Sequence, residues 1–154
     1  DKIKLTSIAQ PLLFGIQSAL TAALGELGLR PDAVLGHSVG EIAAAEACGA
    51  LTRGEAVELI NKRSQLQERA RGLGLMLALR LSAADAREFV DDGKFAGLEI
   101  AAINSPTGVT LAGPTASIKD AASAARRKKI PARLLRVDYP FNSHLLAPRY
   151  AEFM

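Results

Sequence analysis

The chain has 154 residues, of which 49% are hydrophobic and 23% charged, so it is long and apolar enough to bury one core of ordinary size. Its net charge is +3, and the basic residues are dispersed except for the run Arg126-Arg127-Lys128-Lys129. This run lies at the end of a predicted helix and has no aromatic side chains beside it. It therefore favours a solvated helix end, or a surface for an acidic partner protein, over a nucleic-acid site. The single cysteine, Cys48, excludes an intrachain disulfide and suits a reducing compartment. We expect no signal peptide and no apolar run of membrane-spanning length. We therefore predict a cytoplasmic protein that binds neither nucleic acid nor membrane.

The first predicted element is an apolar helix over residues 6–27, where leucine, isoleucine and alanine recur at helical spacing. Pro11 fits the first turn of this helix. A short apolar strand over residues 32–35 follows. It leads directly into a helix of strong helix formers over residues 41–48, which Gly49 closes.

Between that strand and that helix lies Gly36-His37-Ser38-Val39-Gly40, which matches the G-x-S-x-G nucleophile elbow. The serine of such an elbow takes a strained backbone conformation that exposes its hydroxyl, and the two glycines leave room for the turn. Ser38 is therefore the candidate nucleophile, and the backbone N–H of Val39 is the candidate donor to an oxyanion. The five residues alone also fit an ordinary strand-to-helix turn whose serine caps the helix.

The next helix is expected to start at Thr52, because Thr52 and Glu55 form a capping box, and to run to about Arg71. Gly72-Leu73-Gly74 then interrupts the helical pattern, and the character of the sequence changes.

After this break the predicted strands and helices follow the order β-α-β-β-α-β, which is that of a ferredoxin-like unit. The strands cover residues 76–81, 98–104, 109–112 and 132–137, and the helices cover 83–90 and 115–128, capped by Ser82 and Thr115. We therefore predict an α/β protein in which a small subdomain, residues 76–137, is inserted into a larger α/β layer. Residues 1–75 and 138–154 form that layer, and a cleft separates the two.

A serine hydroxyl needs a base within hydrogen-bond reach, and the chain has two histidines. His37 precedes the candidate nucleophile, so we expect its side chain to point away from the Ser38 hydroxyl and to pack in the elbow. His144 is the only other imidazole base, although a solvent-facing histidine fits that position equally well. Arg63, on the helix after the elbow helix, is placed to hold a carboxylate if it faces the cleft, but an arginine on a helix is more often solvated.

Blocks of residues along nearly the whole chain give the elbow a more specific context. They are Ser7-Ile8-Ala9-Gln10-Pro11, residues 30–41, Gly49-Ala50-Leu51, Lys62-Arg63-Ser64, Ala102-Ile103-Asn104-Ser105-Pro106 and residues 137–144. In order and spacing, these blocks resemble the acyltransferase domain of polyketide synthases, which is kin to the malonyl-CoA:acyl-carrier-protein transacylases. The resemblance implies an α/β-hydrolase-like large subdomain with an inserted ferredoxin-like small subdomain, incomplete at both ends of this chain.

The resemblance also implies a function. Ser38 would accept a malonyl-type acyl group from acyl-CoA and pass it to the phosphopantetheine thiol of an acyl carrier protein, beside neighbouring synthase domains, in polyketide or fatty acid synthesis. Arg63 would pair with the free carboxylate of that acyl group, and Gln10, His37 and Phe141 would join it as substrate-binding residues. No metal and no covalently bound cofactor is implied.

One residue departs from the family pattern, because Asn142 occupies the position of the catalytic histidine. An amide cannot accept the serine proton at neutral pH. Three explanations stay open: an impaired copy, natural or engineered; His144 acting from two residues later; or a base elsewhere. In an extended segment His144 would share a side with Asn142 but lie roughly 6–7 Å along the chain, which favours impairment. The rival functions are an acyl hydrolase and a catalytically dead domain kept for carrier-protein or inter-domain contacts.

Overall fold

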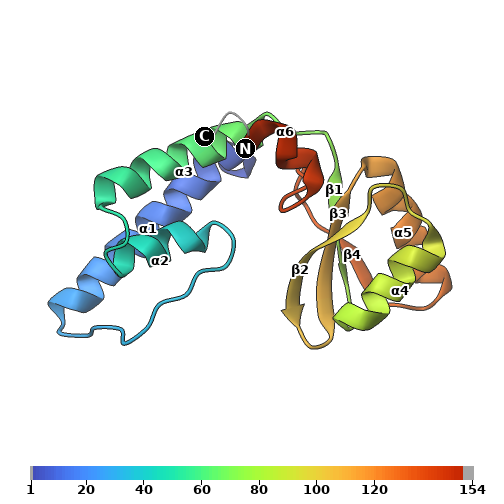
Figure 1. Ribbon diagram of the computed structural model, residues 1–154, viewed down its shortest axis with the longest axis horizontal. Helices are drawn as coiled ribbons and strands as arrows, with labels where there is room; N and C mark the ends of the chain where they lie inside the picture. The colour runs from blue at the N-terminus through green and yellow to red at the C-terminus, as the bar shows by residue number, and fades with distance from the viewer. Residues whose placement is uncertain (1, 151–154) are drawn as a thin grey trace. The chain divides into compact units, whose positions relative to one another are not determined.

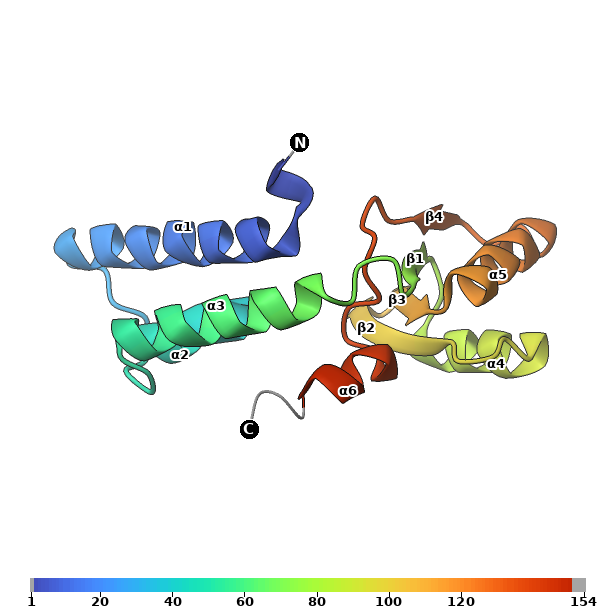
Figure 2. The same cartoon turned by 90° about the horizontal axis from the view of Figure 1, so that it is seen from above.

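The computed structural model describes residues 2–150, and the chain divides into two compact units with a boundary between Glu68 and Arg69 (Figures 1 and 2). The sequence had predicted a division at residues 75 and 138. The second unit begins at Arg69 and includes the described segment after residue 138, and within it the N–H of Gly72 donates to the carbonyl of Asp138 at 2.8 Å. The assignment of residues 138–154 to the larger layer stays a prediction, and residues 151–154 lie outside the described part.

Every regular element among the described residues of the first unit is a helix. A short 3-10 helix η1 (Lys2–Lys4) leads into α1 (Thr6–Glu26), followed by α2 (Gly40–Ala47) and α3 (Arg53–Glu68). Helix α1 packs along α3 and also contacts α2, as both ribbon views show. The buried apolar side chains at this junction are Phe14, Ile42, Ala56 and Ile60.

Helix α1 confirms the predicted helix but differs from the expectation in two respects. Pro11 lies in its second turn rather than its first, so the carbonyl of Ser7 has no proline N–H to accept. The helix is also apolar and long enough, by length and composition alone, to cross a membrane, and the expectation that no such run exists was wrong. Its large apolar side chains are mostly exposed in this chain, among them Leu12, Leu13, Ile16, Leu20 and Leu24.

The strand predicted over residues 32–35 does not form. Residues 33–37 are irregular, and the side chain of Leu35 is 92% exposed. A β-strand exists through hydrogen bonds to a neighbouring strand, and residues 2–68 contain no other strand to pair with it. The apolar pattern of this segment is therefore present without the pairing that would make it a strand.

The second unit contains a four-stranded antiparallel sheet in the order β2-β3-β1-β4. Its strands are β1 (Leu75–Leu79), β2 (Glu99–Ser105), β3 (Gly108–Gly113) and β4 (Ala132–Leu134), with α4 (Ala83–Gly93) and α5 (Thr115–Arg127) between them. Leu77 pairs with Leu111 on one side and with Leu134 on the other, so β1 is a central strand. This is the predicted β-α-β-β-α-β order, and the turn predicted at residues 105–108 joins β2 to β3.

Helices α4 and α5 lie on the same side of this sheet and close its core (Figure 1). Leu77 and Leu79 alternate along β1 toward this face, and Phe89 of α4 and Ile118 of α5 meet them. Ser82 caps α4 as predicted, because its hydroxyl accepts from the N–H of Asp85. Helix α5 has no such cap: Thr115 is already its first helical residue. After the sheet the chain continues through η2 (His144–Leu146) and α6 (Ala147–Tyr150).

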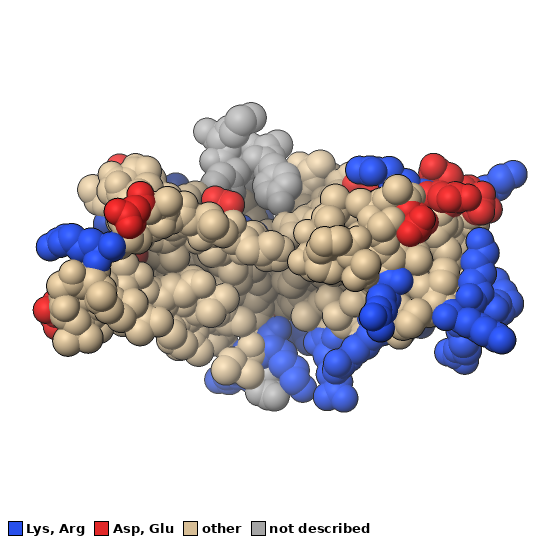
Figure 3. Space-filling view, turned by 90° about the horizontal axis from the view of Figure 1, so that it is seen from below, with Lys and Arg blue, Asp and Glu red and all other residues tan. Residues whose placement is uncertain are grey.

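The basic run at the end of α5 is solvated, as the sequence indicated. All four residues from Arg126 to Lys129 are exposed. Lys128 Nζ lies 3.6 Å from Asp92 Oδ2 and 5.7 Å from the ring centre of Phe89. Figure 3 shows Lys and Arg side chains gathered over this unit, whereas the visible face of the first unit is mainly uncharged.

Candidate active site

The G-x-S-x-G segment forms a sharp turn that ends in α2. Ser38 has φ of 53°, in the left-handed region that costs a residue with a side chain roughly 1–2 kcal/mol. The N–H of Glu41 donates to the Ser38 carbonyl at 3.1 Å and begins the helix. The strained apex expected of a nucleophile elbow is therefore present at Ser38.

The two glycines of the motif differ in their constraints. A Cβ on Gly36 would lie 2.3 Å from the backbone nitrogen of Glu41, which is closer than atoms can approach. A Cβ on Gly40 would meet only the side chain of Gln17, at an ordinary 3.8 Å. Among residues 2–150, the close approach of the turn to α2 requires a glycine at position 36 but not at position 40.

Arg63 brings a cation to the Ser38 hydroxyl. Its Nη2 donates to Ser38 Oγ at 3.2 Å, and both side chains are half-buried. Its Nη1 donates to the side-chain carbonyl of Gln10, which is 8% exposed. The structure therefore brings together three of the predicted site residues, Ser38, Arg63 and Gln10, from three different segments of the first unit.

Two other predicted residues also lie at the elbow. The N–H of Val39 stands at the N-terminal end of α2, just before the first bonded turn, where the helix dipole is positive. The side chain of His37 is exposed, so the expectation that it packs in the elbow was wrong. His37 instead borders a hollow of about 420 Å³ between α1, the 33–37 segment and α2.

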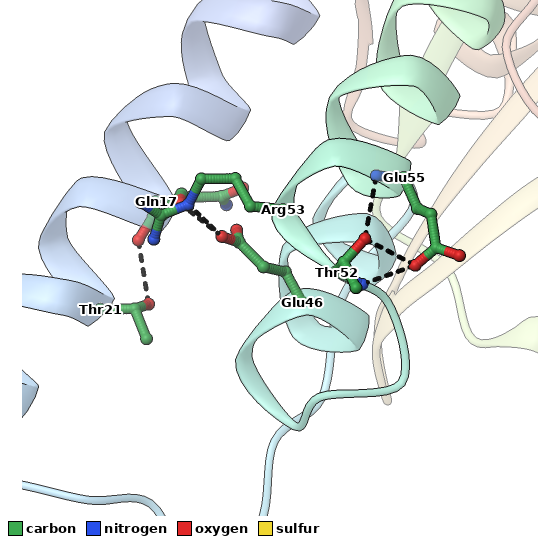
Figure 4. A network of polar contacts seen from close by, with 7 residues as sticks. Gln17, Thr21, Glu46, Thr52, Arg53 and Glu55 are labelled. Atoms are coloured by element: carbon green, nitrogen blue, oxygen red, sulfur yellow. Dashed lines mark hydrogen bonds and ion pairs between the residues drawn. The ribbon is translucent and has the colours of Figure 1, made fainter.

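Polar contacts fix α2 against its neighbours (Figure 4). Glu46 accepts from Arg53 Nε at 2.8 Å and from the Ser18 hydroxyl at 2.9 Å. Burial acts to raise the pKa of the Glu46 carboxyl, but the hydrogen bonds from Arg53 and Ser18 and the charge of Arg53 outweigh it and lower the pKa from its ordinary value. The elbow helix is thereby tied to α1 and to the start of α3.

The predicted capping box at the start of α3 is confirmed (Figure 4). The N–H of Thr52 donates to Glu55 Oε2 at 2.8 Å, and the N–H of Glu55 donates to Thr52 Oγ1 at 3.3 Å. Hydrogen bonds from the Thr52 hydroxyl and backbone lower the pKa of the Glu55 carboxyl.

The remaining predicted residues belong to the second unit. Phe141 is half-buried and stacks on the buried ring of Tyr139, with ring centres 5.1 Å apart. Asn142 is exposed and has φ of 54°. His144 contacts the carboxylate of Glu99 through two atoms. Its backbone N–H donates to Glu99 Oε1 at 2.6 Å, and its ring Nδ1 lies 2.7 Å from the same oxygen. A carboxylate oxygen is an acceptor, so Nδ1–H is the donor in this contact.

The sequence missed one residue of the site, Gln67, which contacts Gln10. Helical spacing could have found it, since Gln67 follows Arg63 by four residues and Ile60 by seven, on the face of α3 that is buried. Among residues 2–150, no group of three or more His, Cys, Asp or Glu side chains is arranged to hold a metal ion.

A family model described as an acyl transferase domain matches residues 1–149, and the chain belongs to that family. Among its relatives, fumosorinone synthetase of Cordyceps fumosorosea is 43% identical over 157 residues, covering 96% of this chain and 4% of that protein. The highly reducing polyketide synthase sphB of Aspergillus fumigatus is 36% identical and covers 94% of this chain and 6% of that protein.

Solved structures agree with this assignment. The acyltransferase domain from the second module of the salinomycin polyketide synthase superposes with a TM-score of 0.92 at 35% identity, over 99% of this chain and 36% of that one. FabD from Acinetobacter baumannii gives a TM-score of 0.92 at 31% identity, over 99% of this chain and 51% of that one. The fold class predicted from the sequence is confirmed. The chain spans a few per cent of the curated relatives above and about a third to a half of these solved structures.

Proposed function

We propose that this acyltransferase chain moves a malonyl-type acyl group from CoA, through an ester on Ser38, to the phosphopantetheine thiol of an acyl carrier protein. The observation that carries the proposal is the contact between Arg63 Nη2 and Ser38 Oγ at a strained elbow. The family assignment and the likeness to synthase domains support it. The partners are then an acyl-CoA, a carrier protein and neighbouring synthase domains in the cytoplasm.

The chemistry has two half-reactions. Ser38 Oγ attacks the thioester carbonyl and loses its proton, the N–H of Val39 stabilises the oxyanion, and CoA leaves as a thiol. The carrier thiol then attacks the Ser38 ester, and the serine recovers its proton. In the resting chain Arg63 Nη2 donates to Ser38 Oγ at 3.2 Å, and acylation of that oxygen releases Arg63 for another acceptor. The malonyl carboxylate is one methylene from the ester carbonyl, so it is the acceptor that Arg63 then binds. Arg63 thus selects acyl groups with a free carboxylate.

The residue at the family's general-base position is not a base in this chain. Asn142, at the family's histidine position, cannot take the serine proton, and loss of such a base commonly costs several orders of magnitude in rate. We expect slow acylation in the natural chain. His144, whose Nδ1 is engaged by Glu99, is the alternative base.

The test is intact-mass measurement of the protein that carries this chain after incubation with malonyl-CoA. One malonyl mass should appear on the natural protein, none on Ser38→Ala, and much faster labelling on Asn142→His. Labelling of Ser38→Ala at the natural rate overturns the proposal. If His144 is the base, His144→Ala abolishes labelling in the natural protein and has little effect in Asn142→His.

Asn142 also favours a second candidate, a domain that binds a carrier protein without acyl transfer. In that case neither the natural protein nor Asn142→His acquires a malonyl group, while carrier-protein binding, measured by calorimetry, persists in both.

A further inference from the structure

A buried amide continues the polar contacts behind Arg63. Gln67, on α3, is 2% exposed, and its Oε1 accepts from Gln10 Nε2 at 2.7 Å. Gln10 Oε1 accepts from Arg63 Nη1, and Arg63 Nη2 donates to Ser38 Oγ. One chain of hydrogen bonds therefore runs from Gln67 to the candidate nucleophile.

The direction of this chain is set by the guanidinium. Arginine only donates, so Gln10 must turn its oxygen toward Arg63 and its NH2 group toward Gln67. Gln67 must then present its oxygen to Gln10. Its own NH2 group is left buried, with no hydrogen-bond partner among residues 2–150.

That orphaned NH2 group is costly for the folded state, since a buried donor loses its water without gaining an acceptor. An apolar side chain of similar volume would remove that cost but would leave one N–H of Gln10 without its acceptor. The need of Gln10 for an acceptor therefore explains a glutamine at position 67.

We propose that Gln67 is a positioning residue that acts through Gln10 to hold Arg63 against Ser38, and so maintains selection of carboxylate-bearing acyl groups. This inference rests on the proposed function. It also changes the role of Gln10: its Oε1 is taken by Arg63, and its Nε2 by Gln67 and the Thr6 hydroxyl, so it orients Arg63 rather than contacting the acyl group.

The experiment compares single-turnover acylation by malonyl-CoA and by acetyl-CoA in the full protein, with Asn142→His as the background for all variants. Gln67→Met keeps the side-chain volume and removes the acceptor. We expect the malonyl-to-acetyl rate ratio to fall about tenfold, as for loss of one hydrogen bond that supports a charged group. Gln65→Met, the same change at an exposed position of α3, should leave the ratio unchanged.

Two further measurements separate positioning from general stability. The melting temperature of Gln67→Met should stay close to that of its parent, because the change removes the orphaned NH2 group of Gln67 but leaves one N–H of Gln10 without its acceptor. In an Arg63→Ala background, Gln67→Met should no longer alter the ratio. A ratio that stays constant in Gln67→Met, or that falls equally with and without Arg63, overturns the inference.

A readout without turnover keeps this test independent of the proposed function. The guanidinium NMR signal of Arg63 is assigned by its loss in Arg63→Ala. It should report a guanidinium with restricted rotation in the parent and in Gln65→Met, and a freely rotating one in Gln67→Met. Restricted rotation of the Arg63 guanidinium in Gln67→Met refutes the positioning role even if no acyl transfer is found. Absence of malonyl transfer with the expected NMR change refutes the proposed function alone.

Discussion

The two units of the chain differ in how completely they bury their apolar residues. In the second unit a sheet and two helices enclose one continuous core around Leu77, Leu111 and Ile118. In the first unit the core is a small junction of α1, α2 and α3, while the apolar side chains of α1 and Leu35 remain exposed. The candidate nucleophile lies in the unit with the smaller core. Because its large apolar side chains remain exposed, we expect the first unit to need additional packing that the second does not.

The sharpest test of this contrast is to produce the units separately. Residues 69–150 should unfold in a single cooperative thermal transition, because their core is complete. Residues 2–68 should retain helix but melt gradually, because little apolar area holds the three helices together. Circular dichroism and calorimetry check both. A cooperative transition in the first fragment would contradict the comparison.

A core substitution should show where the second unit obtains its stability. Leu111 is fully buried, so Leu111→Ala should lower the free energy of unfolding by about 2–5 kcal/mol. Leu134→Ala, on the exposed strand β4, is the matched control and should change it by about 0.5 kcal/mol or less. Chemical denaturation measures both, and equal effects would show that β4 is buried in solution.

In the first unit the elbow is the equivalent sensitive point. Gly36→Ala forces a Cβ against the backbone of Glu41 and should cost at least about 1–3 kcal/mol and displace Ser38, with loss of labelling by malonyl-CoA. Gly40→Ala meets no clash with the described residues and should stabilise α2 by up to about 1 kcal/mol. Similar losses in both variants would indicate that residues outside this chain crowd Gly40.

The smallest expected effect concerns the capping box of α3. Thr52→Ala should cost about 1 kcal/mol. Because the folded-state pKa of Glu55 is below its ordinary value of 4.5, its contribution is present above that pH and is lost as the pH falls through the folded-state pKa. Glu55→Gln should therefore reduce the loss of stability on acidification below about pH 4.5. Denaturation at pH 7 and pH 3 tests this, and an unchanged pH dependence would contradict it.

The same contrast explains what the sequence could predict. The second unit is built from local signals, such as Ser82 as a cap and the turn at residues 105–108, and its elements formed within a few residues of the predicted ranges. The segment at residues 32–35 carries a strand pattern, but strand formation depends on partners that no local pattern specifies.

The site divides in a similar way. The strained turn at Ser38 follows from its five-residue motif. The approach of Arg63 to Ser38, 25 residues away, depends on how α3 packs, and only the family resemblance suggested it. Gln67 was overlooked because glutamine on a helix is usually solvated, whereas here Arg63 gives it a buried role.

The one thiol of the chain has a practical consequence. Cys48 is exposed at the end of α2, the helix that starts directly after the elbow. A maleimide dye would therefore attach at a single place in this chain, at the end of the helix that follows the elbow, without prior removal of other cysteines from this chain. The fluorescence of this dye would test whether incubation with malonyl-CoA changes the surroundings of α2.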